Sequence, residues 1–229
     1  MRHRFAHEVA ALHALDHPGV VPLLDSWISP EGEPCLAMQF LDGPTLRHVL
    51  KEERRLDPVR VARIVEQLGD AVGAIHQRGI VHRDLKPENL IVLGKGEQEL
   101  VVVIDFGTSA ARGPENEQEH TTTLTGSLHY LAPERLAGQY SPASDVYSIA
   151  VMVLEMVTGM RPAEIDGPPG QPEFLQAVGE RTGRAAEKIA LALQHQPGRR
   201  PPDASAWAGE VAKLLRTFSE SRQDGSPST

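Results

Sequence analysis

The feature that most constrains this chain is a polar run between two apolar stretches, the segment from Val81 to Asn89. It reads Val-His-Arg-Asp-Leu-Lys-Pro-Glu-Asn, and a second short run, Asp105-Phe106-Gly107, follows the apolar segment Leu100–Ile104. Both runs come where β-like segments begin or end, and such loops usually carry the chemically active side chains. A lone Asp, Asn or Lys on a loop is most often a turn, cap or surface residue. The joint spacing makes chance agreement negligible, so the two runs predict one site built from two loops.

Composition narrows the class of protein, because 229 residues with 40% hydrophobic content permit a proper core. A net charge of −8 without a basic cluster argues against nucleic acid or an anionic membrane as the main partner. Cys35 is the single cysteine, so an intrachain disulfide and a thiolate metal site are excluded. The most apolar segment, Val146–Val157, is interrupted by Glu155 and is too short to span a bilayer. We therefore expect a globular, cytoplasmic protein with no membrane segment.

The spacing of apolar residues predicts a short mixed segment followed by a mainly helical one. Helical spacing covers Arg2–Leu15, Thr45–Lys51, Pro58–Arg78, Ala143–Thr158, Pro172–Arg181, Ala185–Gln194 and Asp203–Phe218. Short apolar runs predict strands at Val20–Ile28, Pro34–Phe40, Ile80–Val81, Leu90–Leu93 and Leu100–Ile104. The first two strands form an antiparallel pair, since a turn-rich segment joins them. Residues 108–129 are polar and threonine-rich and predict a long exposed loop, and the end after Glu220 predicts a frayed tail.

These motifs resemble those of the eukaryotic-type (Hanks-type) serine/threonine protein kinases, and the resemblance extends from Arg2 to about Phe218. Further matches are Ala132-Pro133-Glu134, Asp145-Val146-Tyr147-Ser148 and Pro197-Gly198-Arg199-Arg200-Pro201. The resemblance implies an α+β, protein-kinase-like fold with two lobes. Residues 1–42 would form a remnant N-lobe of one helix and two strands, residues 43–218 a complete, mainly helical C-lobe, and residues 219–229 a flexible tail.

The function that the resemblance implies is transfer of the ATP γ-phosphate to Ser or Thr of protein substrates, with ATP and Mg²⁺ as cofactors. Asp84 would be the catalytic base or orient the hydroxyl, and Lys86 would contact the γ-phosphate. Asn89 and Asp105 would supply hard oxygen ligands to Mg²⁺. The setting of Lys86 matches the serine/threonine branch. The small-molecule antibiotic kinases share an Asp and an Asn at similar spacing, but they do not typically show the Ala-Pro-Glu segment, which disfavours that alternative.

The resemblance also implies a partial nucleotide pocket. Met38 falls at the gatekeeper position, the backbone of Gln39 and Leu41 at the hinge that reads the adenine edge, and Ile91 beneath the adenine ring. Ordinary core packing explains the apolar residues equally well, because an adenine pocket is itself an apolar pocket.

Regulatory and structural roles are implied for further residues. In such kinases an Arg at the place of Arg83 often receives a loop phosphate, and Thr123 lies at the matching distance before the Gly-Ser segment. A phosphothreonine would add about −1.5 to −2 charge and could pair with Arg83. Ser127 would pack beside Asp84 and Lys86. A simple soluble polar loop is the alternative for these threonines.

The structural matches concern the frame around the site. Glu134 is expected to pair with Arg200, and Asp145 to anchor the backbone of the catalytic loop. His82 and Phe106, with Leu12 and Leu23, match the stacked apolar column that aligns the two lobes in active kinases.

The front of the kinase pattern is missing from this sequence. Glu8 matches a helix glutamate that pairs with a strand lysine in the family, but no such lysine and no glycine-rich loop precede Ala10. These parts would need about 35 to 45 more upstream residues, so we expect an N-terminally truncated chain of low activity. Three interpretations stay open. The chain could be a kinase whose sequence as given begins at an internal methionine, Met1, or a kinase that a partner or a missing upstream segment completes. It could also be a non-catalytic binding module. Glu8 could equally lie on a solvated helix face.

Overall fold

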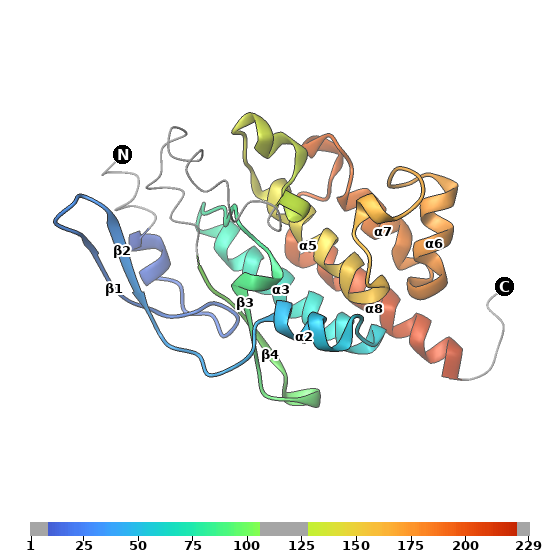
Figure 1. Cartoon of the computed structure of the whole chain (residues 1–229), viewed down its shortest axis with the longest axis horizontal. Helices are drawn as coiled ribbons and strands as arrows, with labels where there is room; N and C mark the ends of the chain where they lie inside the picture. Colours follow the sequence, from blue (N-terminus) through green and yellow to red (C-terminus); the bar gives the residue numbers. More distant parts are fainter. Residues whose placement is uncertain (1–8, 106–127, 224–229) are drawn as a thin grey trace.

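The computed structural model describes residues 9–105 and 128–223, and Figure 1 shows their arrangement. A long β-hairpin lies at one end, beside the short helix formed by residues 9–13. A mainly helical body makes up the rest, with a second, smaller hairpin between the two parts. This is the expected α+β arrangement, with few strands on the N-terminal side and a mainly helical remainder.

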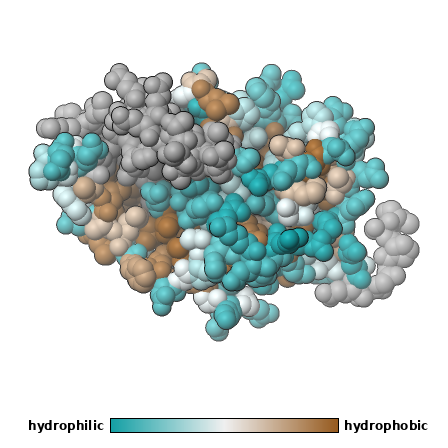
Figure 2. Space-filling model, in the orientation of Figure 1, coloured by the Kyte–Doolittle hydropathy of each residue, from teal (hydrophilic) through white to brown (hydrophobic). Residues whose placement is uncertain are grey.

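The first hairpin consists of β1 (Leu23–Ile28) and β2 (Pro34–Met38), which pair antiparallel as predicted. Both strands are shorter than expected. Val20 pairs instead with Val103 in a parallel bridge, and Pro22, which has no N–H, accepts a hydrogen bond from Gln39 N at 3.0 Å. The apolar side chains at this end that remain exposed are Leu24, Trp27, Ile28 and Phe40, and Figure 2 shows apolar surface there.

The second hairpin, β3 (Leu90–Leu93) with β4 (Leu100–Val103), also pairs antiparallel. Gln67 fixes it to the helical body, because its Nε2 donates to Glu99 O and its Oε1 accepts from Val101 N, both at 2.9 Å. The strand predicted at Ile80–Val81 is wrong. These residues pair in no ladder of the described chain, and Ile80 N donates to Ile75 O, which closes the preceding helix instead.

Two short connections join the first hairpin to the body. On one side, Val21 N donates to Val103 O (3.0 Å) and Val103 N donates to Gly19 O (2.9 Å). On the other side, Val92 N donates to Pro44 O at 2.9 Å. A Cβ at Gly43 would lie 2.5 Å from Val92 O, so this close approach of two backbones requires glycine.

The helices follow the sequence pattern closely. They are α2 (Leu46–Glu53), α3 (Pro58–Gln77), α5 (Pro142–Thr158), α6 (Pro172–Thr182), α7 (Ala185–Ala192) and α8 (Ala204–Gln223). Asp57 caps α3 by accepting from Val59 N, and Pro58 occupies the first turn, where no N–H is needed. Only α8 differs clearly, because it continues past the expected end at Phe218. None of the helices in the described part of the chain is long and apolar enough to cross a membrane.

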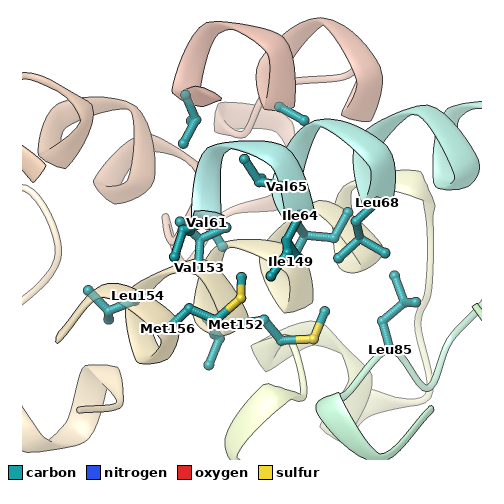
Figure 3. Close-up of a cluster of buried hydrophobic side chains, with 14 of the residues drawn as sticks. Val61, Ile64, Val65, Leu68, Leu85, Ile149, Met152, Val153, Leu154 and Met156 are labelled. Carbon is teal, nitrogen blue, oxygen red and sulfur yellow. The ribbon is translucent and has the colours of Figure 1, made fainter. Parts of the chain in front are cut away.

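The core lies where α3 packs between α5 and α8. Figure 3 shows Ile64 and Leu68 of α3 facing Ile149 of α5, with Leu85 of the Val81–Asn89 run beside them. All four side chains are at most 2% exposed. Burying Leu85 therefore attaches the polar run to the most tightly packed part of the molecule.

The contact between α3 and α8 depends on Gly69. A Cβ there would lie 2.2 Å from the Ala208 Cβ and 2.9 Å from Ala204 O. We expect Gly69→Ala to lower the free energy of unfolding by about 2 kcal/mol, since overpacking outweighs the better helix propensity of alanine. Gly209→Ala is the matched control, because a Cβ at Gly209 meets nothing within 4 Å. It should gain about 0.5–1 kcal/mol in the same urea titration, and a Gly69→Ala variant as stable as wild type would contradict the prediction.

Candidate active site

The site begins with three side chains of the polar run that contact one another. Lys86 Nζ lies 2.7 Å from Asp84 Oδ2. Asn89 Nδ2 donates to Asp84 O at 2.8 Å and to Asp84 Oδ2 at 3.1 Å. The side chain of Asp84 is still 40% exposed, so a carboxylate held by two neighbours remains open to a substrate from outside.

Asp105 lies beside this group because of one backbone contact. Ile104 N, at the end of β4, donates to Asn89 O at 2.9 Å, and Asp105 follows directly. Asp105 is exposed and has a φ of 55°, a left-handed conformation that is uncommon for a non-glycine residue. Such outliers concentrate at functional sites.

The residues of this corner fit a hard divalent cation. The amide nitrogen of Asn89 donates to Asp84, so the amide oxygen Oδ1 is the atom of this buried side chain that could act as a ligand. The exposed carboxylate of Asp105 adds a second oxygen donor. Amide and carboxylate oxygens are the ligands that Mg²⁺ prefers.

Asp145, near the start of α5, holds the backbone of the polar run. Its Oδ2 accepts from His82 N at 2.8 Å and its Oδ1 accepts from Arg83 N at 3.0 Å, while His76 Nε2 lies 2.8 Å from Oδ2. The carboxylate is 1% exposed. The expected contact of Asp145 with the catalytic-loop backbone is present. His82 is buried, with its Nε2 3.2 Å from Ile104 O, so the two loops are also joined through this ring.

Arg83 has a φ of 72° and lies almost buried, with its guanidinium 4.1 Å from the centre of the Tyr140 ring. Arg135 lies over the same ring at 5.2 Å.

The predicted partners Thr123 and Ser127 lie outside the described residues. Glu8, Phe106 and Gly107 lie outside them as well.

The expected ion pair between Glu134 and Arg200 is present, with Nη1–Oε1 and Nη2–Oε2 distances of 2.7 and 2.8 Å. Arg200 also donates to three backbone carbonyls, those of Ala143, Gln194 and His195. Burial alone would raise the pKa of Glu134, but the hydrogen bonds from Arg200, from the Glu134 backbone N–H and from Ser144, with the charge of Arg200, together outweigh burial and lower this pKa. The pair connects the short helical turn Pro133–Ala137 to the segment that precedes α8.

The residues assigned to a nucleotide pocket lie along the inner side of the first hairpin and on β3. Met38 and Leu41 are half-buried against the core, and Ile91 is buried. The backbone N–H of Gln39 donates to Pro22 O, so the Gln39 carbonyl is the backbone group that is left to contact a ligand. A role of these residues in adenine binding stays a prediction.

Sequence reasoning missed a network centred on Arg47 of α2. Its Nε donates to Glu88 at 2.8 Å and its Nη1 to Glu155 at 3.0 Å, while the Tyr130 hydroxyl makes short contacts with both Arg47 and Glu155. Burial, together with Glu155, raises the pKa of Tyr130. Burial opposes the charge of Arg47, but hydrogen bonds to Glu155 and Glu88 raise its pKa. The sequence did contain one sign of this network. Glu155 lies within an apolar helix, and a buried charge requires a partner.

The class of protein follows from the family that the sequence matches. Residues 1–196 match the family described as the protein kinase domain. The chain belongs to the protein kinase domain family.

Curated relatives are named as bacterial serine/threonine kinases. The chain is 31% identical over 240 aligned residues to "Serine/threonine-protein kinase pkn3" of Myxococcus xanthus, covering 98% of this chain and 44% of that protein. It is 33% identical over 217 residues to "Serine/threonine-protein kinase PrkC" of Bacillus subtilis, covering 94% and 29%. The chain therefore spans less than half the length of these relatives.

A solved structure shares the fold. The crystal structure of the Mycobacterium tuberculosis PknI kinase domain aligns with a TM-score of 0.67 and 25% identity, covering 93% of this chain and 79% of that one. The two small sheets and the helical body are thus an arrangement seen in a kinase domain.

Proposed function

We propose that this chain carries out transfer of the ATP γ-phosphate to Ser or Thr hydroxyls of protein substrates. The observation that supports this most is the corner formed by Asp84, Lys86 and Asn89, with Asp105 brought to it by the Ile104–Asn89 hydrogen bond. Phosphoryl transfer depends on positioning and on neutralising charge rather than on covalent chemistry. This corner supplies a base, a cation and oxygen donors at one place.

In the proposed reaction, Asp84 accepts or orients the hydroxyl proton of the substrate through its exposed carboxylate. Lys86 would contact the transferred γ-phosphate, and its position 2.7 Å from Asp84 supports this role because both groups would then meet at the reacting hydroxyl. Asn89 and Asp105 would hold Mg²⁺, which when bound neutralises charge on the phosphates. Met38, Leu41 and Ile91 would receive the adenine, because their surfaces are apolar.

The test is transfer of labelled phosphate from Mg-ATP to the chain itself and to an unstructured Ser/Thr-rich protein. We expect phosphoserine and phosphothreonine among the products, and a rate about 10²–10³-fold lower in Asp84→Asn, since the base and its orientation are lost. Asp166→Asn is the matched control, because Asp166 is exposed and lies on the loop after α5. The measurement is made on the 229-residue chain.

Two results would count against the proposal. Equal rates for wild type and Asp84→Asn would show that this carboxylate takes no part. Tight Mg-ATP binding without transfer would favour the non-catalytic binding module instead.

A further inference from the structure

The helical body contains a cavity of about 430 Å³ that the proposed reaction does not use. It lies where the turn between α2 and α3 meets the last turns of α5, α6 and α8, at the end of the molecule opposite the first hairpin (Figure 1). None of its lining residues belongs to the polar run or to the nucleotide set. Its volume lies within the usual range of small-molecule sites, about 300–1,000 Å³.

Three arginines line this cavity, Arg55, Arg181 and Arg222, and all three are exposed. None of the three forms an ion pair with a carboxylate of the described chain. Asp57 is the one carboxylate among the lining residues, and its Oδ1 is already used as the cap of α3. Three positive charges against one negative charge leave the lining electropositive, although the protein as a whole is acidic.

Hydrogen bonds join the segments that form the walls of the cavity. Leu56 N donates to Met156 O at 2.7 Å, which attaches the α2–α3 turn to α5. Arg222 Nη1 donates to Glu180 O at 3.3 Å, which joins α8 to α6. The guanidinium of Arg222 also lies 5.5 Å from the centre of the Phe218 ring.

The remaining lining is apolar, with one hydroxyl. Leu56, Val157 and Phe218 form this part, and the first two are nearly buried. Ser219 also lines the cavity, and its hydroxyl has no hydrogen-bond partner among the described residues. A ligand that fits must therefore carry a negative group for the arginines and an apolar group for this floor.

We propose that the cavity binds a phosphate monoester, with the phosphate against Arg55, Arg181 and Arg222 and the organic part on the floor of Leu56 and Phe218. Guanidinium groups match the oxygens of phosphate in pairs of hydrogen bonds, and several of them together favour a dianion. The cavity is larger than a bare phosphate needs, which leaves room for the organic part. The same chemistry can come from a phosphorylated side chain of a protein or from a soluble organic phosphate.

The test uses phenyl phosphate as the probe, titrated calorimetrically into the 229-residue chain without Mg²⁺. We expect the double variant Arg55→Gln/Arg181→Gln to bind at least about tenfold more weakly, because charge-assisted hydrogen bonds are lost. Arg184→Gln removes the same charge from an exposed position outside the cavity and should bind within about twofold of wild type. Inorganic phosphate should bind more weakly than phenyl phosphate, since it cannot use the apolar floor.

Several outcomes would overturn the proposal. These are no binding to wild type, equal affinity in the double variant, an equal loss in Arg184→Gln, or benzoate binding as tightly as phenyl phosphate. If the double variant does not fold, Arg55→Lys/Arg181→Lys replaces it and should still weaken binding, because lysine lacks the planar fork. A phosphothreonine peptide that binds more tightly than phenyl phosphate would identify a protein as the source, and a peptide that fails to bind would identify a soluble organic phosphate.

Discussion

Replacing Arg200 by alanine is expected to lower the free energy of unfolding by about 3–5 kcal/mol. The Arg200 side chain is fully buried and makes two hydrogen bonds to Glu134, whose side chain is 9% exposed. Removing the guanidinium leaves that carboxylate buried without its partner, and three backbone carbonyls lose a donor as well. Urea unfolding with linear extrapolation measures the loss.

Control variants distinguish the loss of the ion pair from the loss of one positive charge. Arg199→Ala removes the neighbouring, exposed guanidinium and should cost no more than about 0.5 kcal/mol. Glu134→Leu/Arg200→Met should recover much of the loss, because a buried ion pair can often be replaced by apolar side chains of similar volume. An Arg200→Ala variant within about 1 kcal/mol of wild type would show that the pair does not hold this segment.

The same pair predicts the direction of a pH effect. Burial acts against ionisation, but the hydrogen bonds from Arg200, from the Glu134 backbone N–H and from Ser144, with the charge of Arg200, together lower the pKa of Glu134, so folding favours the ionised carboxylate. Its contribution is fully present above the ordinary pKa of a glutamate, and it is lost as the pH falls through the lowered value. Glu134→Gln should therefore lose less stability than wild type on acidification through this range.

Asp145→Ala is expected to cost about 4 kcal/mol, because the N–H groups of His82 and Arg83 would lose their acceptor inside the molecule. The catalytic loop would also lose its attachment to α5, so phosphate transfer should fall together with stability. Circular dichroism during urea unfolding gives the first quantity and the labelled-ATP assay gives the second. Asp70→Ala is the matched control, since that carboxylate is 69% exposed and should contribute less than about 0.5 kcal/mol.

A variant with wild-type stability but slow transfer would contradict the structural part of this prediction. It would show that Asp145 acts on the reaction without holding the loop. Equal losses in Asp145→Ala and Asp70→Ala would show that a general charge effect, rather than the buried hydrogen bonds, determines the result.

Local signals explain why most of the fold was predictable from the sequence. Pro58 after Asp57 marks the start of α3, and the apolar spacing that follows gives its buried face. The turn between Ile28 and Pro34 gives the first hairpin. For the site, the order of residues in the Val81–Asn89 run was enough to bring Asp84, Lys86 and Asn89 together, because they lie within one tight loop.

The features that were missed depend on contacts between distant parts of the chain. Nothing near Arg47 in the sequence indicates that it meets Glu155, and nothing near Tyr140 indicates that Arg83 lies on its ring. Ile80 has the composition of a strand residue, but its N–H is taken by the end of α3. Spacing along the chain cannot predict such partners, because they are determined only by the packing of helices and loops.

The two short connections of the first hairpin have a consequence for motion between the lobes. One is fixed to β4 at Val103, and the other approaches β3 at Val92 so closely that Gly43 cannot carry a side chain. Movement of the hairpin relative to the body would therefore have to take place between these attachments and the strands, for example at Leu41. Such movement would shift Met38 of β2 relative to Ile91 of β3.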